Sequence, residues 1–200
     1  MLRRQQLTLV LITLLLSGIV SGASDRLLSS WKDPAVKKLD FQHIVAIAMV
    51  SDGPTRRLAE SEMVNIMGPK AVAASQVIPE DDLQDADKVR VQLSAKGFDG
   101  AVTIRLVDAT TKVRTARDPV PTSYYSMWGY YQVVWIADRP PDYYTADQKL
   151  QIEVNIYSLT NGKLVWTGTS EILRPQLVET GVRNVAELVR RRLKKERLID

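Results

Sequence analysis

Carboxylates near predicted strand ends are the side chains of this sequence that could do acid–base chemistry. A glycosidase needs only two of them, one to protonate the leaving group and one to act as base or nucleophile. No serine-nucleophile, zinc-protease or phosphate-loop motif accompanies them, so a carboxylate-dependent hydrolase is an alternative hypothesis only. The candidate acids are Asp99, Asp108, Asp138, Asp142 and Glu153.

Residues that bind metals or act as thiol nucleophiles are scarce. The chain has no cysteine, which excludes disulfides, thiolate catalysis and cysteine-ligated metals, and His43 is its single histidine. A lone histidine at a strand entrance is typical of an ordinary hydrogen-bonded residue. Acidic residues at 80–87 lack the spacing of a calcium loop and suit the start of a helix. We therefore predict no catalytic residues, no metal site and no cofactor.

Aromatic residues are concentrated in residues 118–147, which we predict to be a long insertion. A loop of this length in a compact domain is usually functional, and tyrosine and tryptophan supply contact area at protein interfaces. The alternative is that the aromatic rings cover the core of the domain. The predicted interaction surface consists of Tyr124, Tyr125, Trp128, Tyr130, Tyr131, Trp135, Tyr143 and Tyr144.

The N-terminal residues 1–23 have the pattern of a secretory signal peptide. Arg3 and Arg4 precede an apolar run from Leu7 to Val20, and small residues follow at 21–23. An uncleaved membrane anchor is the alternative, although the run is shorter than the roughly 20 residues of a spanning helix. We expect an exported, periplasmic protein in which residues 24–40 form an N-terminal arm or a short edge element that Trp31 fixes to the domain.

Residues 41–200 are predicted to form a single α/β domain that begins with a strand–helix–strand–helix–strand order. The apolar run His43–Val50 is typical of a strand buried on both faces. Asp52 is a suitable cap for the following helix, whose Arg56 and Glu60 we place on a solvated face. A weaker strand over 71–78 and a helix ending at Gly97 lead to the strand 99–108.

The second half of the domain is predicted to close the sheet. Leu150 to Tyr157 alternates between apolar and polar residues, which is typical of a half-exposed strand with Glu153 on its polar side. Asn161-Gly162 predicts a hairpin, and a C-terminal helix follows the return strand 164–172. The expected architecture is an α/β (α+β) domain with a mixed sheet of about five strands, an aromatic-rich insertion, a β-hairpin and a C-terminal helix.

Charge does not indicate a nucleic-acid partner. The formal net charge is +4, of which Arg3 and Arg4 carry half. The basic residues near the end of the last helix are explained by the helix dipole and solvation in preference to an anionic-membrane patch. They are Arg190, Arg191, Arg192, Lys194, Lys195 and Arg197.

Four segments of the chain resemble a family of bacterial exported proteins and outer-membrane lipoproteins of unknown function. They are the apolar strand that precedes Asp52-Gly53-Pro54-Thr55-Arg56-Arg57, the junction at residues 96–102, the tyrosine-rich middle of the chain and the hairpin at residues 157–168. The layout is similar to the α/β domain of the periplasmic protein TolB and of curli-secretion lipoproteins. The resemblance implies envelope association and protein contacts. Residues 21–24 read Ser-Gly-Ala-Ser, so the lipidated cysteine of such proteins is missing.

The main functional hypothesis is a non-catalytic periplasmic or envelope-associated module that binds an envelope protein through the aromatic-rich segment. A carrier of a small or lipid ligand, with the aromatic segment as a lid over a pocket, is the alternative. Membrane association is compatible with the sequence but not through a lipidated cysteine. The partner's identity and the oligomeric state are left open.

Overall fold

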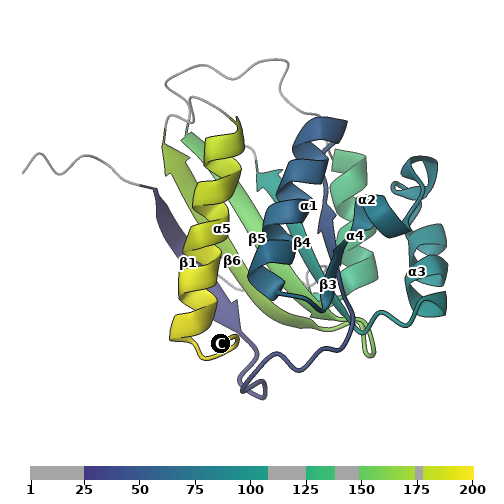
Figure 1. Cartoon of the computed structure of the whole chain (residues 1–200), viewed down its shortest axis with the longest axis horizontal. Helices are drawn as coiled ribbons and strands as arrows, with labels where there is room; N and C mark the ends of the chain where they lie inside the picture. The colour runs from purple at the N-terminus through teal and green to yellow at the C-terminus, as the bar shows by residue number, and fades with distance from the viewer. Residues whose placement is uncertain (1–24, 108–124, 138–148, 174–177) are drawn as a thin grey trace, which may run out of the picture.

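The fold is built on a six-stranded mixed sheet with the strand order β1-β6-β5-β4-β2-β3 (Figure 1). The computed structural model describes residues 25–107, 125–137, 149–173 and 178–200. β2, β3 and β4 run parallel, whereas β4, β5, β6 and β1 pair antiparallel, which confirms the predicted α/β class with a mixed sheet, a hairpin and a C-terminal helix. In chain order the elements are β1 (Arg26–Lys32), β2 (Ile44–Ala48), α1 (Gly53–Met67), β3 (Ala71–Ala73), α2 (Ala74–Val77), η1 (Glu80–Asp82), α3 (Ala86–Ala95), β4 (Gly100–Val107), α4 (Met127–Ala137), β5 (Lys149–Ser158), β6 (Leu164–Leu173) and α5 (Val178–Lys195).

Strand β1 lies in the segment that the sequence suggests is an arm or a short edge element. It pairs antiparallel with β6, and Trp31 lies opposite Thr167. The half-buried Trp31 packs against the core, as expected for a residue that fixes this segment to the domain. The N-terminal segment therefore adds an edge strand to the sheet.

The parallel part of the sheet follows local signals in the sequence. Asp52 caps α1 by accepting a hydrogen bond from the Thr55 amide at 2.8 Å, and Gly97, at φ 72°, ends α3. The predicted strand over 71–78 is wrong beyond Ala73, because the chain turns there into the short helix α2. The carboxylate of Glu60 accepts from the Ser75 amide at 2.9 Å and holds that turn.

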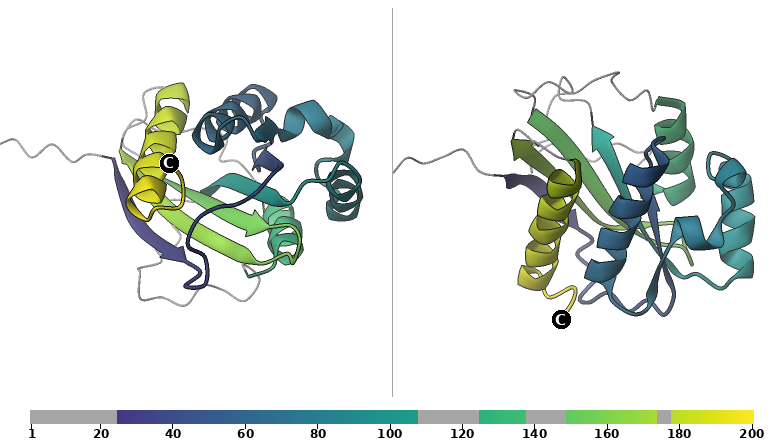
Figure 2. Two further views of the ribbon diagram at one scale, coloured as in Figure 1. Left: turned by 60° about the horizontal axis from the view of Figure 1, so that its bottom comes forward. Right: turned by 45° about the horizontal axis from the view of Figure 1, so that its top comes forward.

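Helices cover both faces of the sheet and create two cores (Figure 2). α1 and α5 pack on one face, and α3 and α4 pack on the other. Along β2, Ala46 and Ala48 belong to the first core, while Val45 and Ile47 belong to the second. All of β2 is buried, as its continuous apolar run predicts.

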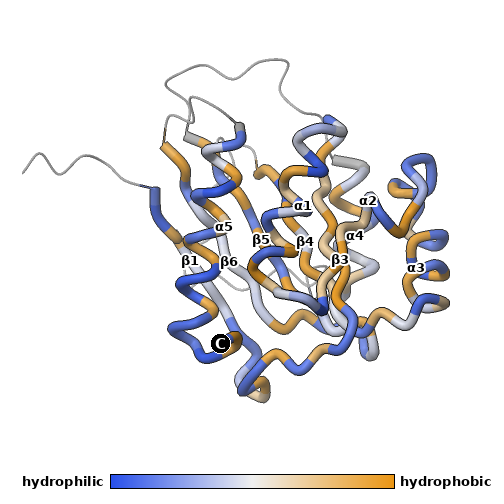
Figure 3. Tube along the Cα trace, in the orientation of Figure 1, coloured by the Kyte–Doolittle hydropathy of each residue, from blue (hydrophilic) through white to orange (hydrophobic). Residues whose placement is uncertain are grey.

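Hydrophilic residues gather on the outer sides of α3 and α5 (Figure 3). Such amphipathic helices are stabilised by burying one apolar stripe while their charged face stays in water. In the described part of the chain, no helix combines the length and apolar character needed to cross a membrane.

Candidate functional site

The segment predicted as an irregular aromatic insertion contains helix α4. Met127, Tyr130 and Val134 recur at helical spacing and are buried on its inner side, together with Tyr131. Tyr130 and Tyr131 are fully buried, so their assignment to a solvent-facing surface is wrong. Their hydroxyls find buried acceptors, Glu153 for Tyr130 and the Leu83 carbonyl for Tyr131, and burial raises the pKa of Tyr131.

The other predicted surface aromatics divide into exposed and half-buried residues. Tyr125 is 45% exposed and makes an edge-to-face contact with Trp31, with ring centroids 6.0 Å apart. Trp128 and Trp135 are half-buried, and both rings pack against Tyr131. The remaining three, Tyr124, Tyr143 and Tyr144, lie outside the described residues.

The outer side of α4 adds two residues that sequence reasoning missed. Val133 is 52% exposed, and its neighbour Gln132 is exposed as well. The sequence pattern that indicates them is the helical spacing of the buried residues. Residues 132 and 133 lie between the buried Tyr131 and Val134, so their side chains face outward. We call the solvent-accessible set the α4 surface; it comprises Tyr125, Trp128, Gln132, Val133 and Trp135.

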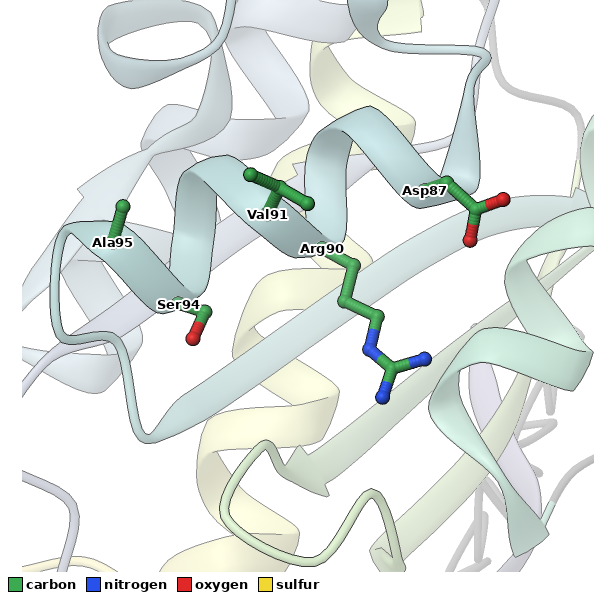
Figure 4. A pocket seen from close by; sticks show the side chains of 5 residues that line it. All are labelled: Asp87, Arg90, Val91, Ser94 and Ala95. Carbon is green, nitrogen blue, oxygen red and sulfur yellow. The ribbon is translucent and has the colours of Figure 1, made fainter.

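Shallow hollows accompany α3 and α4. One of about 570 Å³ lies along α3 (Figure 4). The Arg90 guanidinium beside it lies 6.0 Å from the Trp128 ring centroid on α4. The second, of about 530 Å³, is lined by Gln132, Trp135 and residues 84–87. Both are open and bordered by charged or amide side chains, unlike the enclosed apolar cavity that a lipid carrier needs.

A buried polar network lies beneath α4 on the sheet. Glu153 on β5 accepts hydrogen bonds from Arg105 on β4 at 3.1 Å, from the Tyr130 hydroxyl at 2.9 Å and from the Asn155 amide at 3.0 Å. The Arg105 guanidinium also lies 5.6 Å from the centre of the Tyr130 ring. The polar side of β5 is therefore buried, and its predicted exposure is wrong. The network contains a compensated charge and orients α4 on the sheet.

Asn155, a member of this network, also belongs to a row of three side chains that crosses the sheet. Thr103, Asn155 and Thr167 are cross-strand neighbours on β4, β5 and β6. In the described ranges, Thr103 Oγ1, Asn155 Oδ1 and Thr167 Oγ1 are buried without a hydrogen-bond partner. Such groups lower stability unless something pairs with them.

A second buried carboxylate lies on α1, where the sequence suggests a solvated face. Glu60 is fully buried, and its two oxygens accept from the Ala48 amide at 3.3 Å and the Ser75 amide at 2.9 Å. Burial raises the pKa of Glu60 despite these hydrogen bonds. Arg56 is also buried and pairs with Glu80 at 2.9 Å. Both α1 residues thus tie the helix to neighbouring segments, which corrects their assignment to solvent.

Two of the five candidate acids, Asp99 and Glu153, lie in the described residues, and the sheet keeps these two apart. The Asp99 carboxylate accepts from the amides of Gln42 at 2.8 Å and His43 at 2.9 Å, so it holds the start of β2. Glu153 lies opposite Arg105, six residues along the strand from Asp99, which separates Asp99 from Glu153 by about 20 Å. A glycosidase pair requires roughly 5–9.5 Å. The remaining candidates, Asp108, Asp138 and Asp142, lie outside the described residues.

The described ranges also hold no group of three or more histidine, cysteine, aspartate or glutamate side chains arranged to bind a metal ion. His43 Nδ1 lies 3.2 Å from the Gly97 carbonyl oxygen, which is the ordinary hydrogen-bonded role that its position predicts.

Comparison with known proteins gives a distant likeness in fold. No family model matches the sequence, and no curated protein matches it. Two structures of PelC dodecamers from Paraburkholderia phytofirmans, one a single-residue variant, align with TM-scores of 0.44 and 0.43 at 10% identity. They cover 84% and 88% of this chain and 95% and 99% of the PelC chains. A likeness of this degree carries no information about function.

Proposed function

We propose that this protein is a non-catalytic, exported interaction module that binds a protein partner through the α4 surface. The observation that carries the proposal is the composition of α4. None of its residues from Met127 to Ala137 is charged, although the helix lies in the outer layer of the fold. A helix that is apolar on all sides is normally buried on all sides.

The two sides of α4 support this proposal in different ways. Tyr130, Tyr131 and Val134 saturate the inner side with buried contacts to the sheet and to α3. Val133 is 52% exposed on the outer side. Removing it and the half-buried Trp128 from water would contribute free energy to association, since aromatic and aliphatic anchors dominate interface energetics.

Among the helices of ten or more residues in the described ranges, only α4 lacks charged residues. Helix α3 carries Asp87, Lys88 and Arg90, and α5 has a dense series of basic residues on its outer side. Solubility alone would place charges on α4 as well. Two further exposed residues extend the same apolar character, Tyr125 before α4 and Val91, 67% exposed, on the neighbouring α3. The partner is therefore a protein that presents an uncharged, apolar surface.

Cross-linking in the native envelope tests this proposal. A photoreactive phenylalanine analogue at Val133 is expected to form one discrete adduct with another protein. The matched control places the analogue at Asn65, which is exposed on α1, and is expected to form no such adduct. A Gln132→Glu substitution should weaken the adduct at 133, because it buries an unpaired charge in the interface. Absence of an adduct at 133, or equal adducts at both positions, would contradict the proposal.

Export, a periplasmic location and the resemblance to envelope lipoproteins stay predictions from the sequence. They support the proposal by limiting the partner to envelope proteins. Replacement of buried Tyr130 or Tyr131 is unsuitable as a test, because either change removes core packing and a buried hydrogen bond together.

A further inference from the structure

Six segments of the chain converge at one end of the sheet, the edge formed by the first residues of its parallel strands. β2, β3 and β4 start there, and the β5–β6 hairpin joins them because Gly100 pairs with Ser158. β1 ends beside the start of β6. The end of α5 is attached at the same edge through a hydrogen bond from the Leu39 amide to the Leu198 carbonyl (Figure 1).

Basic side chains occupy each of these segments. Lys32 is half-buried, and the other basic side chains are exposed. We call this set the basic edge; it comprises Lys32, Lys37, Lys38, Lys70, Lys96, Lys163, Lys194, Lys195 and Arg197. Because the lysines before β3 and β4 and in the hairpin belong to other segments than α5, the dipole of α5 does not account for them.

The basic edge is poorly neutralised. Lys38 pairs with Asp200 at 2.7 Å, and no other member forms an ion pair within the described residues. Acids are fewer in the same segments: Asp33, Asp40, Asp99, Glu196 and Asp200 are five, against nine basic side chains. Asp99 accepts from backbone amides at the start of β2, and Glu196 binds Arg192 and the Trp166 indole. The edge therefore presents a net positive potential to solvent.

Arg197 provides an independent observation. It is the one residue other than glycine with positive φ, 58°, in the described ranges. It occupies the left-handed position of a helix-ending motif, in which the Leu198 amide donates to the Leu193 carbonyl and both leucines are fully buried. Glycine is preferred at this position. Arginine is present there at a conformational cost, exposed and, within the described residues, without an ion pair, and conformations of this kind cluster at functional sites.

We propose that the basic edge docks the protein onto a bilayer surface that contains anionic phospholipid. All members but Arg197 are lysines, which are hydrated point charges suited to a diffuse layer of headgroups. Nucleic-acid binding sites use arginine forks and exposed aromatic rings for stacking. In the part of the chain that the structure describes, the exposed large apolar side chains are Val91, Tyr125 and Val133, all on or beside α3 and α4. Binding is therefore electrostatic and reversible, without insertion into the bilayer.

The test compares the exported protein, residues 24–200, on vesicles of pure phosphatidylcholine and on vesicles with about one-third phosphatidylglycerol. Binding to the anionic vesicles is expected at about 0.1 M salt and is expected to be lost at about 0.5 M salt, because salt screens surface charges. The Lys70→Gln/Lys96→Gln double variant should bind roughly ten- to thirtyfold more weakly, at roughly fivefold per charge.

The matched control removes the same charge far from the basic edge. Arg57 at the start of α1 and Arg183 in the first half of α5 are exposed, and the Arg57→Gln/Arg183→Gln variant should change affinity less than about twofold. Equal loss in both double variants would show a net-charge effect and overturn the proposal. Equal binding to neutral vesicles would overturn it too, as would tighter binding to duplex DNA than to the anionic vesicles.

Discussion

Glu153 lies opposite Arg105 across the β4–β5 pair, and the two side chains form a buried ion pair with 3.1 Å between Arg105 Nε and Glu153 Oε1. The same carboxylate oxygen accepts from Tyr130 on α4. A charged residue in the middle of a strand thus specifies where an apolar helix packs. This contact fixes the position of the uncharged α4 together with two other hydrogen bonds, from the Tyr131 hydroxyl to the Leu83 carbonyl and from the Met127 amide to the Gly162 carbonyl.

Glu153→Ala is expected to destabilise the protein by about 3–5 kcal/mol, because one change removes the shared acceptor of three donors at a buried site. Urea unfolding measures this loss. Glu187→Ala is the control, since that half-exposed glutamate pairs with exposed Arg190 and Arg191 and should matter by less than about 1 kcal/mol. Similar losses in both variants would contradict the role of the network.

Signals within a few residues of each other could be read from the sequence. The apolar run of β2, the Asp52 cap, the Gly97 stop and the Asn161-Gly162 hairpin are all present as expected. In each of them the physical cause lies in backbone conformation or in burial on both faces. Neither cause depends on which distant segment is adjacent.

Features that depend on distant partners could not be read. The alternation of β5 correctly indicates two faces, but burial of its polar face depends on Arg105 and Tyr130. α4 was hidden by its aromatic composition, although Met127, Tyr130 and Val134 have helical spacing. For residues 24–40 the sequence leaves an arm and an edge element open, and the pairing with β6 decides for the edge strand β1.

Glu60 is expected to make stability fall with rising pH. Its pKa is raised above the ordinary value of 4.5 in the folded protein, so the unfolded chain ionises first as pH increases. The free energy of unfolding that the neutral Glu60 contributes, measured against a Glu60→Gln variant, is therefore fully present below pH 4.5. This contribution decreases as the pH rises through the raised pKa of the folded protein. Urea midpoints of both proteins between about pH 4 and pH 8 measure this difference. A difference that grows with pH would show that the folded pKa is lowered.

Arg197 is expected to strain the end of α5. Arg197→Gly should be more stable than Arg197→Ala by about 1 kcal/mol, because both lose the charge but only glycine adopts positive φ without cost. The corresponding difference in melting temperature is about 2–4 °C. If the two variants melt together, the left-handed conformation of residue 197 carries no strain.

We expect that position 168 must be glycine because the side chain of Trp166 occupies the space of a Cβ there. The fully buried indole lies over the glycine, and a Cβ at position 168 would be 2.3 Å from Trp166 Cη2. Gly168→Ala must therefore displace the ring, whose Nε1 donates to Glu196 at 2.9 Å, and we expect a loss of about 1–3 kcal/mol in urea unfolding.

A matched control for Gly168→Ala lies two residues further along the same face of β6. Ser170 is fully buried, and its hydroxyl has no hydrogen-bond partner in the described part of the chain, so Ser170→Ala should be neutral or stabilising within about 1 kcal/mol. If the clash is with the indole, Trp166→Phe should make Gly168→Ala less costly, and the double variant should lose less stability than the sum of the two single losses. Additive losses would show that the glycine is required by the backbone of β6 and not by Trp166.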